Sequence, residues 1–220
     1  MASSTGSPPS GDGAARDALT IAGRGAGRVL PVFVITGPSG AGKGTLEQEL
    51  LRRRPGQLEL AVSGTTRPQR PGEVDGVHYW FKTPEEFDRL VEEDELLEWV
   101  TYVGHRYGTL RAEIDRIRGL GRAPLLDLEL EGALRVRDEV AGSISVFVDA
   151  PLAELERRLR ERATESTGEI GERVVLAKSQ KEQAGRFDYV VVNDDLERAA
   201  EELVAIVDGA LTSAGTISRP

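Results

Sequence analysis

The sequence predicts an α/β fold, in which a parallel sheet carries helices on both faces. Two observations predict it. An apolar run at residues 32–36 leads through a glycine-rich loop into the amphipathic segment 46–54. In the second half of the chain, short apolar runs then alternate with segments that repeat apolar residues at helical spacing. Strands separated by helices pair in parallel, and such sheets bind ligands at the carboxyl ends of their strands.

The elements follow in a regular order. The first strand (32–36) precedes a helix that Pro55 ends. The later elements are a strand at 125–130, a helix at 133–140, a strand at 143–149, a helix at 152–162, a strand at 187–193 and a closing helix at 196–211. These segments define a core made of residues 29–60, 115–157 and 187–211.

Two segments interrupt this alternation. Residues 61–114 combine proline and glycine turn signals with short aromatic runs, which predicts a small β-rich insertion. Residues 158–186 hold arginines and glycines in a polar setting, which is typical of a movable lid. Residues 1–28, rich in Gly, Ser, Ala and Pro, are expected to form a disordered tail, and residues 212–220 a flexible end.

Composition limits the function. The 220 residues can bury one core, and a net charge of -9 argues against a general nucleic-acid binder, so local arginine clusters must meet any anionic substrate. No apolar run approaches the length of a membrane span, and the chain contains no cysteine. We therefore expect a cytoplasmic protein that binds neither membrane nor nucleic acid. Composition indicates no oligomeric state.

The loop after the first strand has the composition of a phosphate cradle. Gly37, Gly40 and Gly42 let the backbone wrap around an anion, the helix that follows adds the positive end of its dipole, and Lys43 adds a full charge. Gly44 separates Lys43 from Thr45, so Thr45 or a water that it holds would bind Mg²⁺. The residues expected to bind ATP here are Gly37, Pro38, Ser39, Gly40, Ala41, Gly42, Lys43, Gly44 and Thr45.

Residues 63–79, SGTTRPQRPGEVDGVHY, carry a second anion-binding pattern. Arg67 and Arg70 lie three residues apart around a proline-stiffened turn, and Tyr79 follows. Two guanidinium groups and a phenol can hold one phosphate through several hydrogen bonds.

These motifs resemble those of guanylate kinases, whose acceptor segment reads T-T-R-x-x-R-x-G-E-x-[DN]-G-x-D-Y, followed by E-W and Y-G-[ST]. Here the segments are TTRPQRPGEVDGVHY, Glu98-Trp99 and Tyr107-Gly108-Thr109, and the resemblance extends over roughly residues 30–208. It implies two sets of GMP-binding residues. Arg67, Arg70, Tyr79 and Tyr107 would hold the phosphate, whereas Ser63, Glu98 and Thr109 would read the guanine.

The chemistry of guanine fits this assignment. Guanine presents adjacent N1–H and N2–H₂ donors, which an ionised carboxylate such as Glu98 can accept together, whereas adenine has an acceptor at N1. Without its neighbouring motifs, Glu98 would be interpreted as an exposed carboxylate in the acidic run EEDELLE.

Asp127 and Glu129 are two residues apart in the expected strand 125–130 and would therefore face the same side. The resemblance implies that Asp127 orders Mg²⁺ through water and that both residues contribute to the GMP site. Glu129 stands where the family has an aspartate that helps to read guanine, and Glu131 where it has a glutamine.

The resemblance also implies a set of lid and donor-site residues. Arg158, Arg162 and Arg173 match arginines that neutralise the transferred phosphoryl group, and Ala163 replaces a glycine. Asn193 would lie beside the adenine of ATP.

Together, these matches imply a P-loop kinase that transfers a phosphoryl group from MgATP to GMP or dGMP. Two alternatives remain at this point. One is a guanylate-kinase-like module that binds phosphopeptides without catalysis, and the other is a related kinase that acts on a different phosphorylated acceptor.

Overall fold

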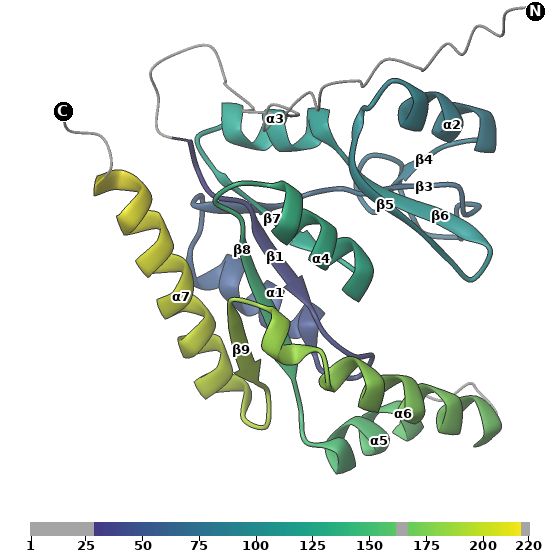
Figure 1. Ribbon diagram of the computed structural model, residues 1–220, viewed down its shortest axis with the longest axis vertical. Helices are drawn as coiled ribbons and strands as arrows, with labels where there is room; N and C mark the ends of the chain where they lie inside the picture. Colours follow the sequence, from purple (N-terminus) through teal and green to yellow (C-terminus); the bar gives the residue numbers. More distant parts are fainter. Residues whose placement is uncertain (1–28, 162–166, 217–220) are drawn as a thin grey trace, which may run out of the picture.

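The computed structural model describes residues 29–161 and 167–216, and its centre is a five-stranded parallel sheet (Figure 1). The strand order is β2-β7-β1-β8-β9. The strands are β1 (Phe33–Thr36), β2 (Leu58–Leu60), β7 (Ala123–Asp127), β8 (Ile144–Asp149) and β9 (Tyr189–Val192). This confirms the predicted α/β class. The short strand β2, at one edge of the sheet, was not predicted.

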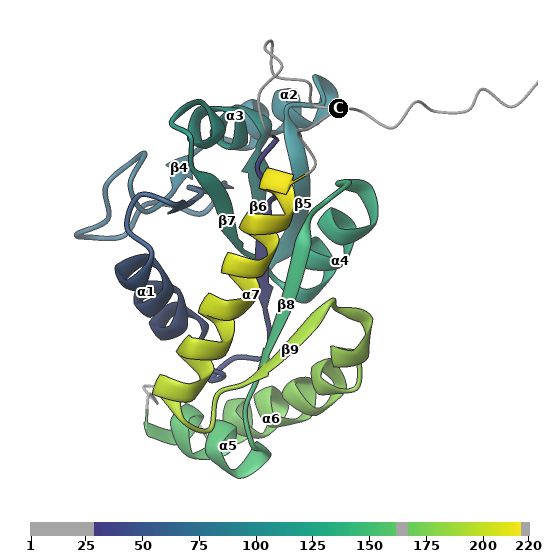
Figure 2. The same ribbon diagram turned by 90° about the vertical axis from the view of Figure 1, so that its left-hand side faces the viewer.

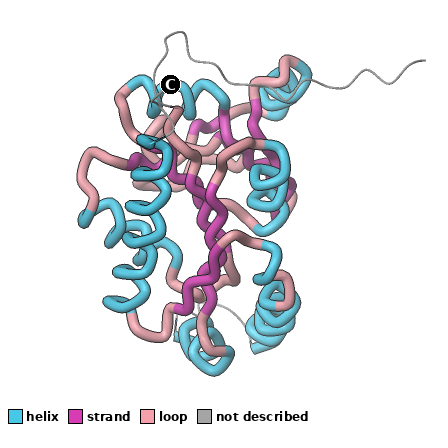
Figure 3. The backbone as a smooth tube through the Cα atoms, turned by 60° about the vertical axis from the view of Figure 1, so that its left-hand side comes forward, coloured by secondary structure: helices cyan, strands magenta, loops and turns pink. Residues whose placement is uncertain are grey.

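Helices cover both faces of this sheet (Figures 2 and 3). Successive side chains of the central segment 32–35 point to opposite faces, so they pack against two different sets of helices. Phe33 and Ile35 join the core cluster formed with α1 (Lys43–Arg53) and α7 (Leu196–Thr216). Val32 and Val34 join the opposite cluster, formed with α3 (Arg111–Gly119) and α4 (Leu130–Glu139). The central strand β1 is thus buried on both sides, as expected in a parallel sheet.

A second sheet of four strands, ordered β4-β3-β6-β5, forms within residues 61–114. Its strands are β3 (Gly64–Thr65), β4 (Trp80–Phe81), β5 (Leu96–Tyr102) and β6 (His105–Leu110). The segment is not purely β, because it also contains α2 (Pro84–Glu92). That helix begins with a capping box, in which the Thr83 side chain accepts from the Glu86 N–H and the Glu86 carboxylate accepts from the Thr83 N–H.

Two helices follow β8, namely α5 (Leu152–Glu161) and α6 (Thr167–Lys181), and a short 3₁₀ turn, η1 (Ala184–Arg186), leads into β9. Lys181, the last residue of α6, donates to the Asp149 carboxylate and, at 2.8 Å, to the Ala150 carbonyl. The end of α6 is thereby tied to the carboxyl end of β8. In Figure 1, α5 and α6 lie on the same side of the molecule as the second sheet.

The prediction of a strand at 125–130 was wrong at both ends. β7 begins at Ala123 and ends at Asp127. The Leu128 N–H still donates to the Ile35 carbonyl, but the Glu129 carbonyl already accepts from the Ala133 N–H and so starts α4. Glu129 is therefore an exposed residue at the N-cap of α4, not part of the strand.

Within the two described ranges, no helix is long and apolar enough to cross a membrane. The predicted tail, Arg162, Ala163 and the last residues of the predicted flexible end lie outside these ranges.

Candidate active site

The phosphate loop, residues 37–45, depends on glycine at positions where its backbone turns. Gly37, Gly40 and Gly42 have φ values of 145°, 88° and 87°, a region that residues with a Cβ rarely adopt. Space is limiting as well, because a Cβ on Gly37 would lie 2.0 Å from the Val148 carbonyl oxygen. The loop is thus fitted closely against the carboxyl end of β8.

Two side chains from late in the chain brace this loop. The buried Asn193 amide donates to the Ala41 carbonyl at 2.7 Å, and its Nδ2 would lie 2.4 Å from a Cβ on Gly42. The Arg158 guanidinium donates to the carbonyls of Gly40 (3.2 Å) and Ala41 (3.3 Å). Arg158 therefore contacts the backbone of the loop directly. Arg173 lies on α6 and is partly buried.

A cleft of about 390 Å³ opens above the loop. Its lining is formed by Pro38, Ser39, Gly40, Gly42, Lys43, Gly44, Thr45, Gln48 and Asp127. Lys43 Nζ donates to the Gly37 carbonyl at 2.9 Å, which holds its charge over the loop. The first turn of α1 carries no acidic residue, so its N–H groups and dipole favour an anion here.

Mg²⁺ fits the oxygen donors of this cleft. Thr45 offers a hydroxyl and Asp127 a carboxylate, the hard ligands that Mg²⁺ prefers. Among the described residues, no group of three or more His, Cys, Asp and Glu side chains could hold a metal by itself. These donors therefore suit a metal that is bound mainly by nucleotide phosphates and water.

Glu47, a buried acid behind this cleft, was not identified from the sequence. Its side chain is on α1, it is 4% exposed, and its Oε1 has no hydrogen-bond partner. Burial, and to a smaller extent the negative charge of Asp127, raise its pKa to about 8, while the positive charge of Lys43 opposes this shift. The pKa of Asp127 is raised as well, chiefly by desolvation. The available signal was a glutamate beside Leu46, on the buried side of an amphipathic helix.

The predicted phosphate-binding residues of the second sheet gather around Glu73. The Arg67 guanidinium donates to both Glu73 carboxylate oxygens (2.7 and 3.0 Å) and lies 5.3 Å from the Tyr79 ring centre. The ring centres of Tyr79 and Tyr107 are 5.9 Å apart, and the Arg70 N–H donates to Glu73 at 2.8 Å. We call Arg67, Arg70, Tyr79 and Tyr107 the arginine clamp.

Glu73 was not assigned a role from the sequence, although it is the glutamate of the R-x-G-E motif. Its contacts with Arg67 and the Arg70 N–H lower the pKa of Glu73 to about 2, so this carboxylate stays ionised. It therefore fixes the direction of the Arg67 side chain.

The predicted base-reading residues come together on β5 and β6. Glu98 is 5% exposed, and its Oε1 accepts from the Thr109 hydroxyl at 2.8 Å. Burial raises the pKa of Glu98, and its bonds with Thr109 oppose this shift. The antiparallel register that pairs Gly64 with Gly108 brings Ser63, the residue before β3, toward Thr109.

Gly132 closes this pair from the side of α4. A Cβ on Gly132 would lie 2.6 Å from Glu98 Oε2, so only glycine allows the helix to approach the carboxylate so closely. Arg135, one turn later on α4, donates to the Trp99 carbonyl at 3.1 Å, and its charge opposes the rise in the pKa of Glu98. Neither residue was identified from the sequence as part of the site.

The arginine clamp and the cleft interact through charge. The pKa of Tyr79 is raised by burial and by Tyr107, Arg67 opposes the rise, and the negative charge of Asp127 in the cleft wall adds to it. The structure does not bring Glu129 onto the strand with Asp127, although the two charges still interact.

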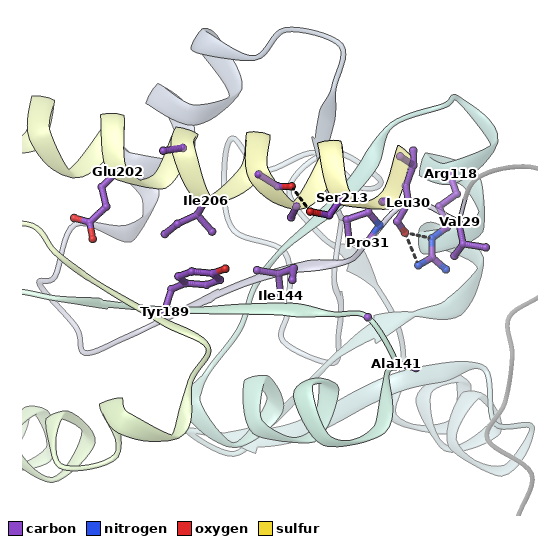
Figure 4. A pocket seen from close by; sticks show the side chains of 15 residues that line it. Val29, Leu30, Pro31, Arg118, Ala141, Ile144, Tyr189, Glu202, Ile206 and Ser213 are labelled. Atoms are coloured by element: carbon purple, nitrogen blue, oxygen red, sulfur yellow. Dashed lines mark hydrogen bonds between the residues drawn. The ribbon is translucent and has the colours of Figure 1, made fainter. Parts of the chain in front are cut away.

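A larger, mainly apolar groove of about 1040 Å³ lies elsewhere, between α7 and the starts of β8 and β9 (Figure 4). Arg118 borders it and donates to the Leu30 carbonyl at 2.8 Å. The groove is at the amino ends of the strands, opposite the phosphate loop. Because parallel sheets bind ligands at the carboxyl ends of their strands, the loop cleft is the better candidate for the active site.

Comparison with known proteins agrees with this geometry. The family model described as guanylate kinase matches residues 30–210. The guanylate kinase of Synechococcus sp. (strain JA-3-3Ab) is 49% identical over 177 residues, which cover 80% of this chain and 81% of that protein. That of Desulfitobacterium hafniense (strain Y51) is 43% identical over 177 residues, covering 80% of this chain and 88% of that protein.

A solved structure gives the same result. The crystal structure of guanylate kinase from Anaplasma phagocytophilum superposes with a TM-score of 0.65 at 27% identity, covering 84% of this chain and 88% of that one. The fold, the phosphate loop and the matched motifs all agree. The chain belongs to the guanylate kinase family.

Proposed function

We propose that this protein transfers the γ-phosphoryl group of MgATP to GMP or dGMP, giving ADP and the nucleoside diphosphate. The observation that carries the proposal is the buried Glu98–Thr109 pair, because a carboxylate kept from water matches the paired N–H donors of guanine. The arginine clamp would hold the acceptor phosphate, and the loop cleft would hold the phosphates of ATP.

The residues suggest a mechanism based on positioning and charge. Phosphoryl transfer needs little covalent chemistry from a protein, and the acceptor phosphate is already an anion at neutral pH, so no general base is required. Lys43 would neutralise negative charge on the transferred phosphoryl group. Arg158 and Asn193 hold the phosphate loop that carries Lys43. Arg162 and Arg173 are proposed to complete this set from the lid.

Thr45 and Asp127 would hold Mg²⁺, Asp127 through water. When bound, Mg²⁺ would offset the negative charge of the nucleotide phosphates. We further propose that residues 61–114 and 158–186 act as GMP-binding domain and lid, whose closure excludes water from the reaction. We place the protein in the cytoplasm.

The alternatives fit the site less well. A binding module for phosphopeptides would not require Lys43 above a glycine loop that is braced by Asn193 and Arg158. A kinase for another acceptor would not require the Glu98–Thr109 pair. Family membership supports the same choice.

Two substitutions test the acceptor assignment. Glu98→Ala should lower kcat/KM for GMP by the equivalent of about 1 to 3 kcal/mol and reduce the preference for GMP over AMP, because it removes the partner of the guanine donors. Arg67→Ala should weaken both acceptors alike, because both carry the same phosphate. The assay is steady-state ADP formation with each acceptor. An unchanged GMP-to-AMP ratio in a folded Glu98→Ala protein would refute the role of Glu98.

A further inference from the structure

Glu47 differs from the other buried glutamates of the described chain in having a fully buried carboxylate oxygen without a hydrogen-bond partner. Glu113, equally buried, accepts from the Val62 N–H and from the Arg116 guanidinium. Glu98 accepts from Thr109. Only Glu47 Oε1, among the carboxylate oxygens of the described residues, is buried with no hydrogen-bond partner.

The position is one where an apolar side chain would serve the fold better. Glu47 is buried on α1 together with its neighbour Leu46 and with Leu50, one turn later. A buried polar group that lacks a partner costs folding free energy, and leucine has nearly the same volume without that cost. Helix formation and core packing therefore do not explain the glutamate.

The surroundings of Glu47 point instead to the nucleotide cleft. Its charge interacts with two residues, Asp127 and Lys43, and both line that cleft. Lys43 does not pair with it, because its Nζ hydrogen-bonds to the Gly37 carbonyl and no ion pair joins it to Glu47. Glu47 lies one helical turn after Lys43 on α1, so the two side chains leave the same face of the helix, and the charge of Glu47 reaches Asp127.

We propose that Glu47 is a positioning residue for the metal–nucleotide complex, and that its unpartnered oxygen holds a water of hydrated Mg²⁺ together with Asp127. Mg²⁺ keeps several of its waters in proteins, so an outer ligand of this kind is chemically suitable. The proposal rests on the proposed function in that it needs a metal–nucleotide complex in the cleft. It does not require that the acceptor be GMP.

The test measures how strongly Mg²⁺ improves ADP binding, by calorimetry on the full chain with MgCl₂ or with EDTA. The measured quantity is the Mg²⁺ ratio, defined as the Kd of ADP in EDTA divided by its Kd in MgCl₂. For Glu47→Leu, this ratio should fall at least about 5-fold, and the unfolding midpoint should equal or exceed that of the wild type. Glu47→Gln keeps an oxygen acceptor and should stay within about 2-fold of the wild-type ratio. Glu49→Leu is the control, because the half-buried Glu49 of the same helix is ion-paired with Arg52 and Arg53 and does not line the cleft.

A wild-type Mg²⁺ ratio in folded Glu47→Leu would overturn the proposal, whatever its stability, because a purely structural glutamate would change only the unfolding midpoint. If the leucine variant does not fold, Glu47→Met provides the same comparison with a more adaptable side chain. ADP binding requires no acceptor, so the two proposals can fail separately. If the wild type does not turn over GMP but Glu47→Leu has a reduced Mg²⁺ ratio, only the proposed GMP kinase function is refuted. If the wild type turns over GMP but Glu47→Leu has the wild-type Mg²⁺ ratio, only the role of Glu47 is refuted.

Discussion

Replacing Gly132 by alanine tests how closely α4 must approach the Glu98–Thr109 pair. The new Cβ would lie 2.6 Å from Glu98 Oε2, whereas carbon and oxygen atoms in contact are usually at least about 3.2 Å apart. The carboxylate or the helix must therefore retreat by about 0.6 Å. Glu98 cannot shift freely, because its other oxygen is held by Thr109 at 2.8 Å.

A misplacement of 1 Å in an enzyme site can cost about 10²-fold in rate. We therefore expect Gly132→Ala to lower kcat/KM for GMP about 10-fold or more, and to leave the slow ATP hydrolysis without acceptor unchanged. The matched control is Gly209→Ala on α7, where no atom lies within 4 Å of the new Cβ. It should raise the unfolding free energy by about 0.5 to 1 kcal/mol without changing activity. Wild-type kcat/KM for GMP in Gly132→Ala would refute the close-contact argument.

The remaining predictions concern charge and strain. Lys43→Ala should lower kcat at least about 10²-fold with an unchanged unfolding midpoint, and near-normal turnover in the folded variant would contradict the role of Lys43. Val103 is 78% exposed in the turn between β5 and β6 and has a φ of 48°, in the left-handed region that asparagine adopts more readily than valine. Val103→Asn should therefore raise the free energy of unfolding, measured in urea, by about 1 kcal/mol. An unchanged free energy of unfolding would mean that the valine backbone adopts this conformation without cost. The pKa of Glu47 is about 8 in the folded chain against 4.5 for an ordinary glutamate, so its protonated form favours folding. Wild-type stability should therefore fall relative to Glu47→Gln as pH rises from 5 to 8, by at most about 4 kcal/mol, and a pH-independent difference would contradict the shift.

The sequence was sufficient to predict the features that depend on short, contiguous patterns. The strand–loop–helix unit around Lys43 was predicted because glycine, lysine and the flanking apolar runs are adjacent in the chain. The same holds for Arg67 and Arg70, which share one turn. The pairing of Glu98 with Thr109 across two strands was predicted only through the resemblance to a family, because register is not visible in residue types alone.

The features that were missed depend on contacts that residue types alone do not show. Gly132 matters because α4 meets β5, a contact between distant segments, whereas Glu73 matters because a single turn folds its side chain back onto Arg67. Helix α2 could have been found locally, since Thr83 and Glu86 form a capping box after a β-rich stretch. The strand predicted through Glu129 was too long because the alternation of leucines with Asp127 and Glu129 does not show where a sheet ends.

The most direct test of the account is the rate of ADP formation from MgATP by the full chain, with GMP, AMP, UMP or no acceptor. We expect rapid ADP formation with GMP and a kcat/KM at least about 10⁴-fold lower with AMP, because adenine would leave the buried Glu98 carboxylate without its donors. Equal rates with GMP and AMP, or a rate with GMP no higher than without acceptor, would contradict it.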